Sequence, residues 1–91
     1  MRRAAKVDLN QQEIVRVLRA AGFTVRHTHT IGRGFPDLVV GRLETNLLVE
    51  VKRPGEKLTA DEREFFDTWR GSVIIAHDAE DVVEWFSGMQ P

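Results

Sequence analysis

The chain has 91 residues, 42% of them hydrophobic and 30% charged, which are the proportions of an ordinary soluble globular domain. No apolar run approaches the roughly 18 residues that a membrane span needs. There is no cysteine, which excludes disulfides and thiolate metal sites. The net charge is −1, yet residues 1–42 carry eight Lys/Arg against three Asp/Glu, and residues 43–91 carry five against eleven. This asymmetry predicts one basic surface on a weakly acidic protein, although scattered solvated charges explain the composition equally well.

The length predicts a single domain with a modest core, because small domains bury a smaller share of their surface. Residues 1–8 are expected to form a basic N-terminal arm, and their two arginines lack the apolar segment of a secretory signal. Residues 9–91 are expected to form the folded domain.

The first predicted helix covers residues 9–21. Four apolar side chains recur at helical spacing on one face: Ile14, Val17, Leu18 and Ala21. Asn10 followed by Glu13 makes a capping box at the start, and Gly22 is a natural stop at the end.

Three strands are predicted next. Residues 23–29 are rich in β-branched and aromatic side chains, and the glycines and proline of residues 30–36 make a loop after them. Residues 37–43 and 46–52 are the second and third strands. The short link at 44–46 joins these two strands as an antiparallel hairpin.

A second helix is predicted over residues 58–71, with Thr59 as its N-cap and Glu62 completing a capping box. A fourth strand covers residues 72–76, and a last helix covers residues 78–88 and is capped by its first residue. The order is αβββαβα. A meander that receives a crossover strand through a helix predicts an α/β fold with a mixed sheet.

Three charged residues stand out against this pattern. Glu50 and Lys52 are two apart on one predicted strand, so they share a face. Asp37 opens the neighbouring strand, and hairpin pairing places the start of one strand beside the end of the other. The sequence therefore predicts that the three side chains meet at one end of the sheet.

Two converging carboxylates are costly unless a cation lies between them. Hard oxygen ligands suit Mg²⁺ or Mn²⁺, and such a metal can activate a phosphodiester for hydrolysis. Lysine can orient the attacking water or offset charge on the phosphorus centre. On its own, Glu-x-Lys is a common strand pattern without function, so the combination with the Gly-rich loop and Pro-Asp carries the hypothesis.

The segments "GFPDLVV" and "LLVEVKRPGEKLT" resemble the PD-(D/E)XK nuclease superfamily, and most closely its VRR-NUC (virus-type replication-repair nuclease) branch. The resemblance spans the chain from the first helix to the last strand. It implies a restriction-endonuclease-like αβββαβ core with a mixed central sheet flanked by helices, to which this chain adds a C-terminal helix.

The resemblance also implies site residues. Asp37 and Glu50 correspond to the metal ligands, Lys52 to the catalytic lysine, and the Val51 carbonyl to a further ligand. Many members present a glutamate from the first helix, and Glu13 is the matching candidate here. A role for Glu13 in the site and a role as a helix cap remain open alternatives.

Other residues have two interpretations each. By the resemblance, Glu62 stands where the family often has a glutamine. It is either an additional carboxylate beside the site or simply part of the helix cap. His27 and His29 are predicted to share a strand face, which suggests zinc, but packing or contact with DNA fits them better. Arg26 and Arg33 flank the loop before Asp37. They either hold phosphates near the metal or are simply solvated charges.

Three functions are open. The first is a Mg²⁺/Mn²⁺-dependent, structure-selective endonuclease acting on branched DNA (Holliday junctions or flaps) in repair or recombination. By the resemblance it would be a homodimer, with no membrane partner, in the cytoplasm of a bacterium or a phage-infected cell. The second is a non-catalytic nucleic-acid-binding subunit that retains the nuclease fold. The third is a regulatory α/β protein whose acidic half mimics DNA.

Overall fold

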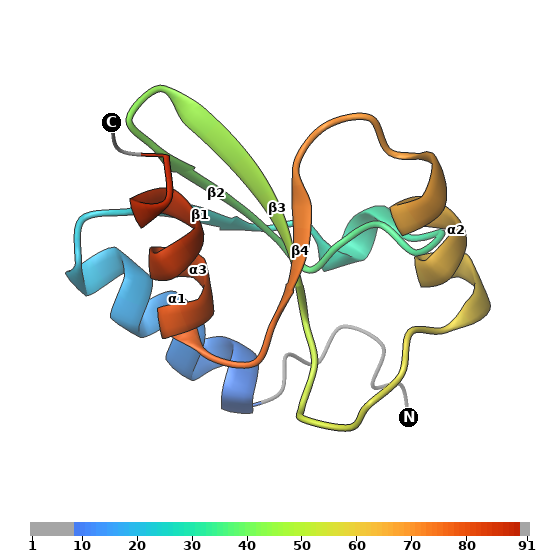
Figure 1. The fold of residues 1–91 in the computed structure, drawn as a ribbon. Coiled ribbons are helices and arrows are strands. Elements are labelled where there is room, and N and C mark those ends of the chain that lie inside the picture. The colour runs from blue at the N-terminus through green and yellow to red at the C-terminus, as the bar shows by residue number, and fades with distance from the viewer. Residues whose placement is uncertain (1–8, 90–91) are drawn as a thin grey trace.

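Residues 9–89 are described by a computed structural model, and they form a four-stranded sheet with helices on both sides (Figure 1). The strands are β1 (Thr24–His27), β2 (Leu38–Arg42), β3 (Thr45–Val51) and β4 (Val73–Ala76). The helices are α1 (Leu9–Ala20), α2 (Ala60–Thr68) and α3 (Ala79–Ser87), with a short 3₁₀ helix, η1 (His29–Ile31). The predicted arm, residues 1–8, lies outside the described residues. Between residues 9 and 89 no helix has the length and apolar character needed to cross a membrane.

The sheet has the strand order β1-β2-β3-β4 and is mixed, which confirms the predicted fold class. β1, β2 and β3 form an antiparallel meander, and β4 joins β3 in parallel after the crossover through α2. The β2–β3 hairpin turns on Leu43 and Glu44, both of which have positive φ, 55° and 65°. A two-residue turn with this backbone matches the right-handed twist of the strands. The turn therefore begins one residue earlier than the link predicted at 44–46.

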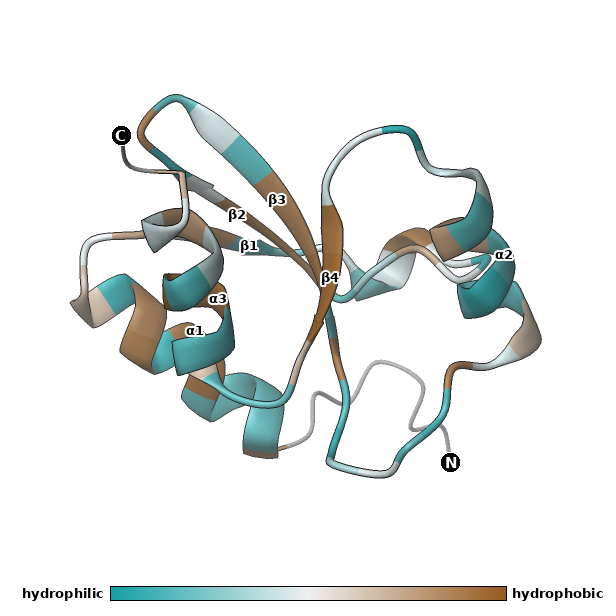
Figure 2. Cartoon of the chain, in the orientation of Figure 1, coloured by the Kyte–Doolittle hydropathy of each residue, from teal (hydrophilic) through white to brown (hydrophobic). Residues whose placement is uncertain are grey.

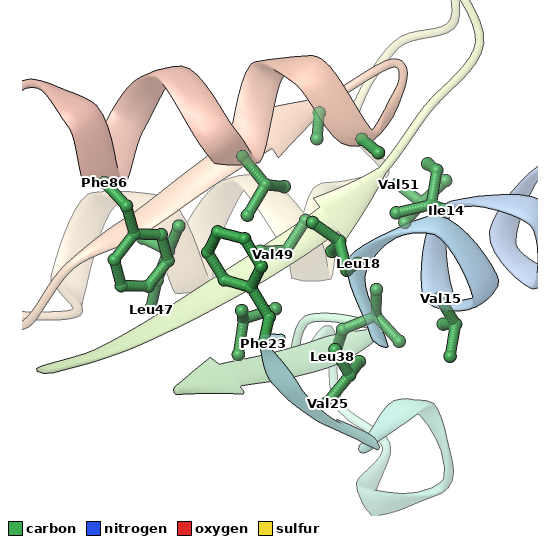
Figure 3. Packing of buried hydrophobic residues seen from close by; sticks show 14 residues of the cluster. Ile14, Val15, Leu18, Phe23, Val25, Leu38, Leu47, Val49, Val51 and Phe86 are labelled. Atoms are coloured by element: carbon green, nitrogen blue, oxygen red, sulfur yellow. The ribbon is translucent and has the colours of Figure 1, made fainter. Parts of the chain in front are cut away.

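The hydrophobic core lies between one face of the sheet and the pair α1 and α3 (Figure 3). Both helices and the strands β2, β3 and β4 contribute side chains with no exposed surface, among them Leu18, Leu38, Val49 and Val82. Phe23 and Phe86 close one end of the core edge to face, with ring centroids 5.3 Å apart. Fully burying a large aliphatic or aromatic side chain stabilises a fold by about 1.5–3 kcal/mol, so this face supplies most of the stability.

α2 lies on the other side of the sheet (Figure 1) and carries both polar and apolar residues (Figure 2). None of its residues is fully buried. Its apolar side chains form a small aromatic cluster with the loop before β2. The Phe35 and Phe65 centroids are 5.2 Å apart, and the Phe65 and Trp69 rings stack at 4.8 Å. The predicted capping box is confirmed, since Thr59 and Glu62 satisfy each other's backbone N–H groups. This second face carries less apolar packing than the first.

The histidines depart from the sequence prediction. β1 ends at His27, whereas the predicted strand extended to residue 29. The chain then bends into η1, which begins at His29. His27 and His29 therefore do not share a strand face, although their rings still meet edge to face at 5.8 Å.

The start of α1 also differs. Asn10 lies inside the first described turn of the helix, and its side chain donates to the His77 carbonyl at 3.4 Å. Glu13 pairs with Arg16 one turn further along, with an N–O distance of 2.7 Å. The predicted Asn10–Glu13 capping box is therefore replaced by two other contacts.

Candidate active site

Alternation along β3 separates apolar side chains from charged ones. Val49 and Val51 point into the core beneath α1 and α3, so Glu50 and Lys52 point to the face on which α2 lies. Both are nonetheless buried, with 3% and 6% of their surfaces exposed. A carboxyl and an ammonium thus sit together, shielded from water, where the third strand ends.

Asp37 is brought to the same place by the register of the hairpin. Leu38 pairs with Val49, so Asp37, one residue earlier, lies opposite Glu50. Asp37 Oδ2 accepts a hydrogen bond of 2.9 Å from the N–H of Val51. The sheet ladder is ending here, and the carboxylate takes the place of the next backbone acceptor.

The loop before Asp37 is fixed from two sides. The Thr28 N–H donates to the Asp37 carbonyl, and the Thr28 hydroxyl donates to the Pro36 carbonyl, both at 2.8 Å. On the other side Gly34 lies directly against the backbone of Asp61 and Glu62, so closely that a Cβ on Gly34 would overlap it. The loop is therefore held between β1 and the first turn of α2.

α2 adds a third carboxylate to the cluster. Glu62 Oε1 accepts from Lys52 Nζ at 2.7 Å and from the Thr59 N–H at 2.9 Å. Lys52 Nζ also lies 3.8 Å from Glu50 Oε2, beyond hydrogen-bonding distance. The sequence placed Glu62 near the site, but its bond to the lysine depends on the docking of α2.

The two strand carboxyls resist ionisation. Burial, followed by the charges of Asp37 and Glu62, raises the pKa of Glu50 to about 9. Burial also raises the pKa of Asp37, against the hydrogen bonds from Val51 and Glu50. At neutral pH Glu50 is therefore mostly protonated when no cation is bound, so its 3.8 Å contact with Lys52 is not a full ion pair.

Lys52 and Glu62 form the true ion pair of the cluster. Burial is the largest single influence and disfavours the lysine charge, but the hydrogen bond to Glu62 and the nearby carboxylate charges together outweigh it, so the pKa of Lys52 is raised. Burial likewise disfavours the charge of Glu62, but its bonds to Lys52 and to the Thr59 N–H lower its pKa. Both groups are charged near neutral pH and hold each other in place.

The donor set fits a hard divalent cation. Asp37 and Glu50 face each other across neighbouring strands, and a cation between them would remove the repulsion that raises their pKa values. Within residues 9–89, however, no group of three or more histidine or acidic side chains could hold a metal ion by itself. Mg²⁺ commonly binds through only one or two carboxylates and fills its other positions with water and substrate phosphate, so two ligands are sufficient.

The backbone of Lys52 is also fixed. Its N–H donates to the Ala76 carbonyl at 3.1 Å, and its carbonyl accepts from His77 Nδ1 at 2.7 Å. The carbonyl can only accept, so Nδ1 of His77 carries the proton. The sequence signal that could have identified His77 is its position just after β4, the strand that runs parallel to β3.

The structure places the other candidates differently. Glu13 is exposed on α1, which covers the opposite sheet face, and it pairs with Arg16. It is therefore not brought together with Asp37. Arg26 is exposed and pairs in register with Val39, so it stands on the same sheet face as Asp37. Arg33 is exposed in the loop before the site, with a φ of 54°.

Gln11 is a buried polar residue that sequence reasoning missed. It comes from α1, is 6% exposed, and its Nε2 lies 3.1 Å from His27 Nδ1. Burial, with the charges of His29 and Arg19, lowers the pKa of His27, while Asp37 opposes this effect. The charge of Asp37 therefore acts on the pKa of His27, and no sequence pattern marked the contact between Gln11 and His27.

Comparison with known proteins identifies the family of the domain. The family model of the VRR-NUC domain matches residues 3–84, which includes Asp37, Glu50 and Lys52. No curated protein and no solved structure matches the chain. The match covers well over half of the 91 residues. The chain therefore belongs to the VRR-NUC domain family, a nuclease-type family.

Proposed function

We propose that the chain is a Mg²⁺- or Mn²⁺-dependent endonuclease that hydrolyses phosphodiester bonds in branched DNA, such as Holliday junctions or flaps. The observation that carries this proposal is the convergence of Asp37, Glu50 and Lys52 at the end of β3. Val51 lies between Glu50 and Lys52 in the sequence, and its backbone N–H donates a hydrogen bond of 2.9 Å to Asp37 Oδ2. A buried site of two acids and one lysine suits metal-dependent phosphoryl chemistry.

Asp37 and Glu50 would hold the cation through their carboxylate oxygens. The Val51 carbonyl is a further candidate, because the N–H and C=O of one strand residue point to the same side and the Val51 N–H points to Asp37. When bound, the cation would polarise the scissile phosphodiester and favour ionisation of an attacking water.

Lys52 is assigned a catalytic role in direct contact with the attacking water and the phosphate. Its ammonium would orient the attacking water and offset the negative charge that grows on the phosphate oxygens. The water gives up a proton to solvent, its oxygen forms a bond to phosphorus, one ester bond to phosphorus breaks, and the departing oxygen takes a proton from solvent. Lys52 is suited to this role because its charge is retained in a buried site.

Recognition of the DNA is assigned to phosphate contacts and shape. Arg26 lies on the same sheet face as Asp37, and Arg33 lies in the loop that leads to it. Arginine contacts to phosphate position a protein on DNA without reading its sequence. We expect the rate to depend on the structure of the DNA and on the salt concentration.

A homodimer is part of the proposal, since two identical sites suit a symmetric junction. It is supported by apolar side chains left open on the α2 side of the sheet. Trp69 is 43% exposed, and Ile75, on the edge strand β4, is 40% exposed. Sedimentation equilibrium of the parent and of Ile75→Lys tests it, and a monomeric parent would contradict it.

The decisive experiment compares labelled four-way junction, flap and linear duplex DNA with Mg²⁺, with Mn²⁺ and with a chelator. The parent should cut the branched substrates only with metal. Glu50→Gln and Lys52→Ala should each lower the rate by about 100-fold or more, the usual scale for losing a group that stabilises a transition state. Unfolding in urea serves as the folding control for both variants.

The outcomes separate the candidate functions. If both variants cut as fast as the parent, the catalytic assignment is wrong. If the parent binds branched DNA but never cuts it with either metal, the chain is a non-catalytic binding subunit.

A further inference from the structure

Glu62 makes two contacts through one atom. Its Oε1 accepts from the backbone N–H of Thr59, which completes the cap of α2, and from the ammonium of Lys52 at 2.7 Å. The side chain is only 19% exposed. One oxygen thus ties the start of α2 directly to the lysine assigned to catalysis.

Lys52 needs such an anchor. A lysine ammonium sits on a flexible four-carbon stem, and ordering the stem costs side-chain entropy. The nearest oxygen of Glu50 is 3.8 Å away, too far for a hydrogen bond. Glu62 therefore makes the short contact that fixes where the charge of Lys52 lies.

The position of Glu62 is itself set by the loop that carries Asp37. Gly34 of this loop lies against the backbone of Asp61 and Glu62, with no room for a Cβ. The loop, the end of β3 and the first turn of α2 are thus joined at one point. A shift of α2 would move the ammonium relative to the two strand carboxyls.

We propose that Glu62 is a positioning residue that holds the Lys52 ammonium at a fixed place beside Asp37 and Glu50. This inference rests on the proposed nuclease function for its kinetic consequence. The contact itself exists whether or not the chain cuts DNA.

The kinetic test uses three variants. Glu62→Ala removes the anchor and should lower kcat on branched DNA by about 10- to 100-fold with little change in KM, the scale expected for a misplaced catalytic group. Glu62→Gln keeps an oxygen that can accept both hydrogen bonds and should recover most of that loss. Thr59→Ala removes the hydroxyl that accepts from the Glu62 N–H at 3.2 Å but leaves the Glu62 carboxylate in place.

Thr59→Ala is the control for the helix cap. This variant loses the contribution of the N-cap hydroxyl to stability but keeps the Lys52–Glu62 pair, so it should cut at the parental rate. If Thr59→Ala loses as much activity as Glu62→Ala, Glu62 acts through the helix cap alone and the proposal is wrong. A parental kcat in Glu62→Ala overturns it equally.

A second readout does not need catalysis. The chain has three lysines, Lys6, Lys52 and Lys57, and an ammonium held in a buried ion pair gives a side-chain ¹H–¹⁵N signal protected from exchange. The signal absent from Lys52→Arg belongs to Lys52. It should persist in Thr59→Ala and vanish in Glu62→Ala.

The two readouts separate the two ideas. A parent that cuts no DNA but shows the protected signal, lost in Glu62→Ala, refutes the nuclease function and supports the anchor. A parent that cuts branched DNA while Glu62→Ala keeps the protected signal refutes the anchor and leaves the nuclease function standing.

Discussion

The Asp37 carboxylate accepts the backbone N–H of Val51, 2.9 Å away, at the point where β2 no longer pairs with β3. Oδ2 of the side chain thus completes the sheet, whereas the proposed role of Asp37 is to hold a metal ion. The hydrogen bond needs only an acceptor oxygen, but the proposed metal ligation needs the carboxylate charge. The two roles can therefore be separated by substitution.

Asp37→Asn should abolish metal-dependent cleavage but keep the protein as stable as the parent, because an amide oxygen can still accept from Val51. Asp37→Ala should abolish cleavage too, and should also lose about 1 kcal/mol of unfolding free energy for the orphaned N–H. Urea unfolding and cleavage assays on both variants check this. Equal stability of the two variants would mean that the hydrogen bond contributes nothing.

Stability without metal should depend on pH through Glu50. Its pKa is about 9 in the folded chain and near 4.5 when the group is unperturbed. Between these values the folded chain holds a proton that the unfolded chain has released. The free energy of unfolding therefore falls as pH rises across this window, by at most about 1.4 kcal/mol per pH unit from this group.

The measurement is urea unfolding with a chelator at pH 6 and pH 8. Glu50→Gln removes the titrating group and should flatten the fall. Added Mg²⁺ should stabilise the parent more at pH 8 than at pH 6, because releasing the proton of Glu50 to the solvent costs less free energy at the higher pH. A Glu50→Gln variant with the same pH slope as the parent would rule out Glu50 as its source.

Gly34 and Gly32 form a matched pair for testing how α2 is docked. Both have positive φ, 78° and 87°, so Ala strains the backbone at either position. Only at Gly34 would the new Cβ overlap neighbouring backbone; nothing lies within 4 Å of it at Gly32. Gly34→Ala should lose about 1–3 kcal/mol more stability than Gly32→Ala, measured by urea unfolding. Similar losses would show that α2 moves freely away from the loop.

Arg26 should contribute to DNA affinity without reading sequence. Arg26→Ala should weaken binding of branched DNA at low salt and reduce the slope of log K against log salt by about 1, as for one lost phosphate contact. Arg70, exposed just beyond the far end of α2 from Glu62, gives the control Arg70→Ala, for which no change is expected. Fluorescence anisotropy over a salt series measures both, and equal slopes for the two variants would exclude Arg26 from the interface.

The meeting of Asp37, Glu50 and Lys52 was predictable because it follows from local rules. Strand alternation fixes the face of Glu50 and Lys52, and a tight hairpin fixes which ends of β2 and β3 adjoin. The positions of other residues depend on tertiary packing. Whether Glu13 reaches the site depends on which sheet face α1 covers, and the periodicity of one helix does not specify that.

Two contacts of Lys52 could not be predicted from local sequence rules, because they too depend on tertiary packing. Glu62 is ten residues from Lys52 along the chain, and His77 is twenty-five residues away. Sequence reasoning gave Glu62 its cap, which is a local contact, but the ion pair requires α2 to dock beside the end of β3. His77 reaches the Lys52 carbonyl only because β4 runs parallel to β3.

The two faces of the sheet differ in what they contain, and this has a consequence for natural variation. The apolar core fills the α1–α3 side, while the acids and the lysine lie on the α2 side. Substitutions beneath α1 and α3 should be visible mainly in the melting temperature, and those on the other side mainly in turnover. A lineage could therefore alter its chemistry or its choice of substrate while the part that keeps it folded stays untouched.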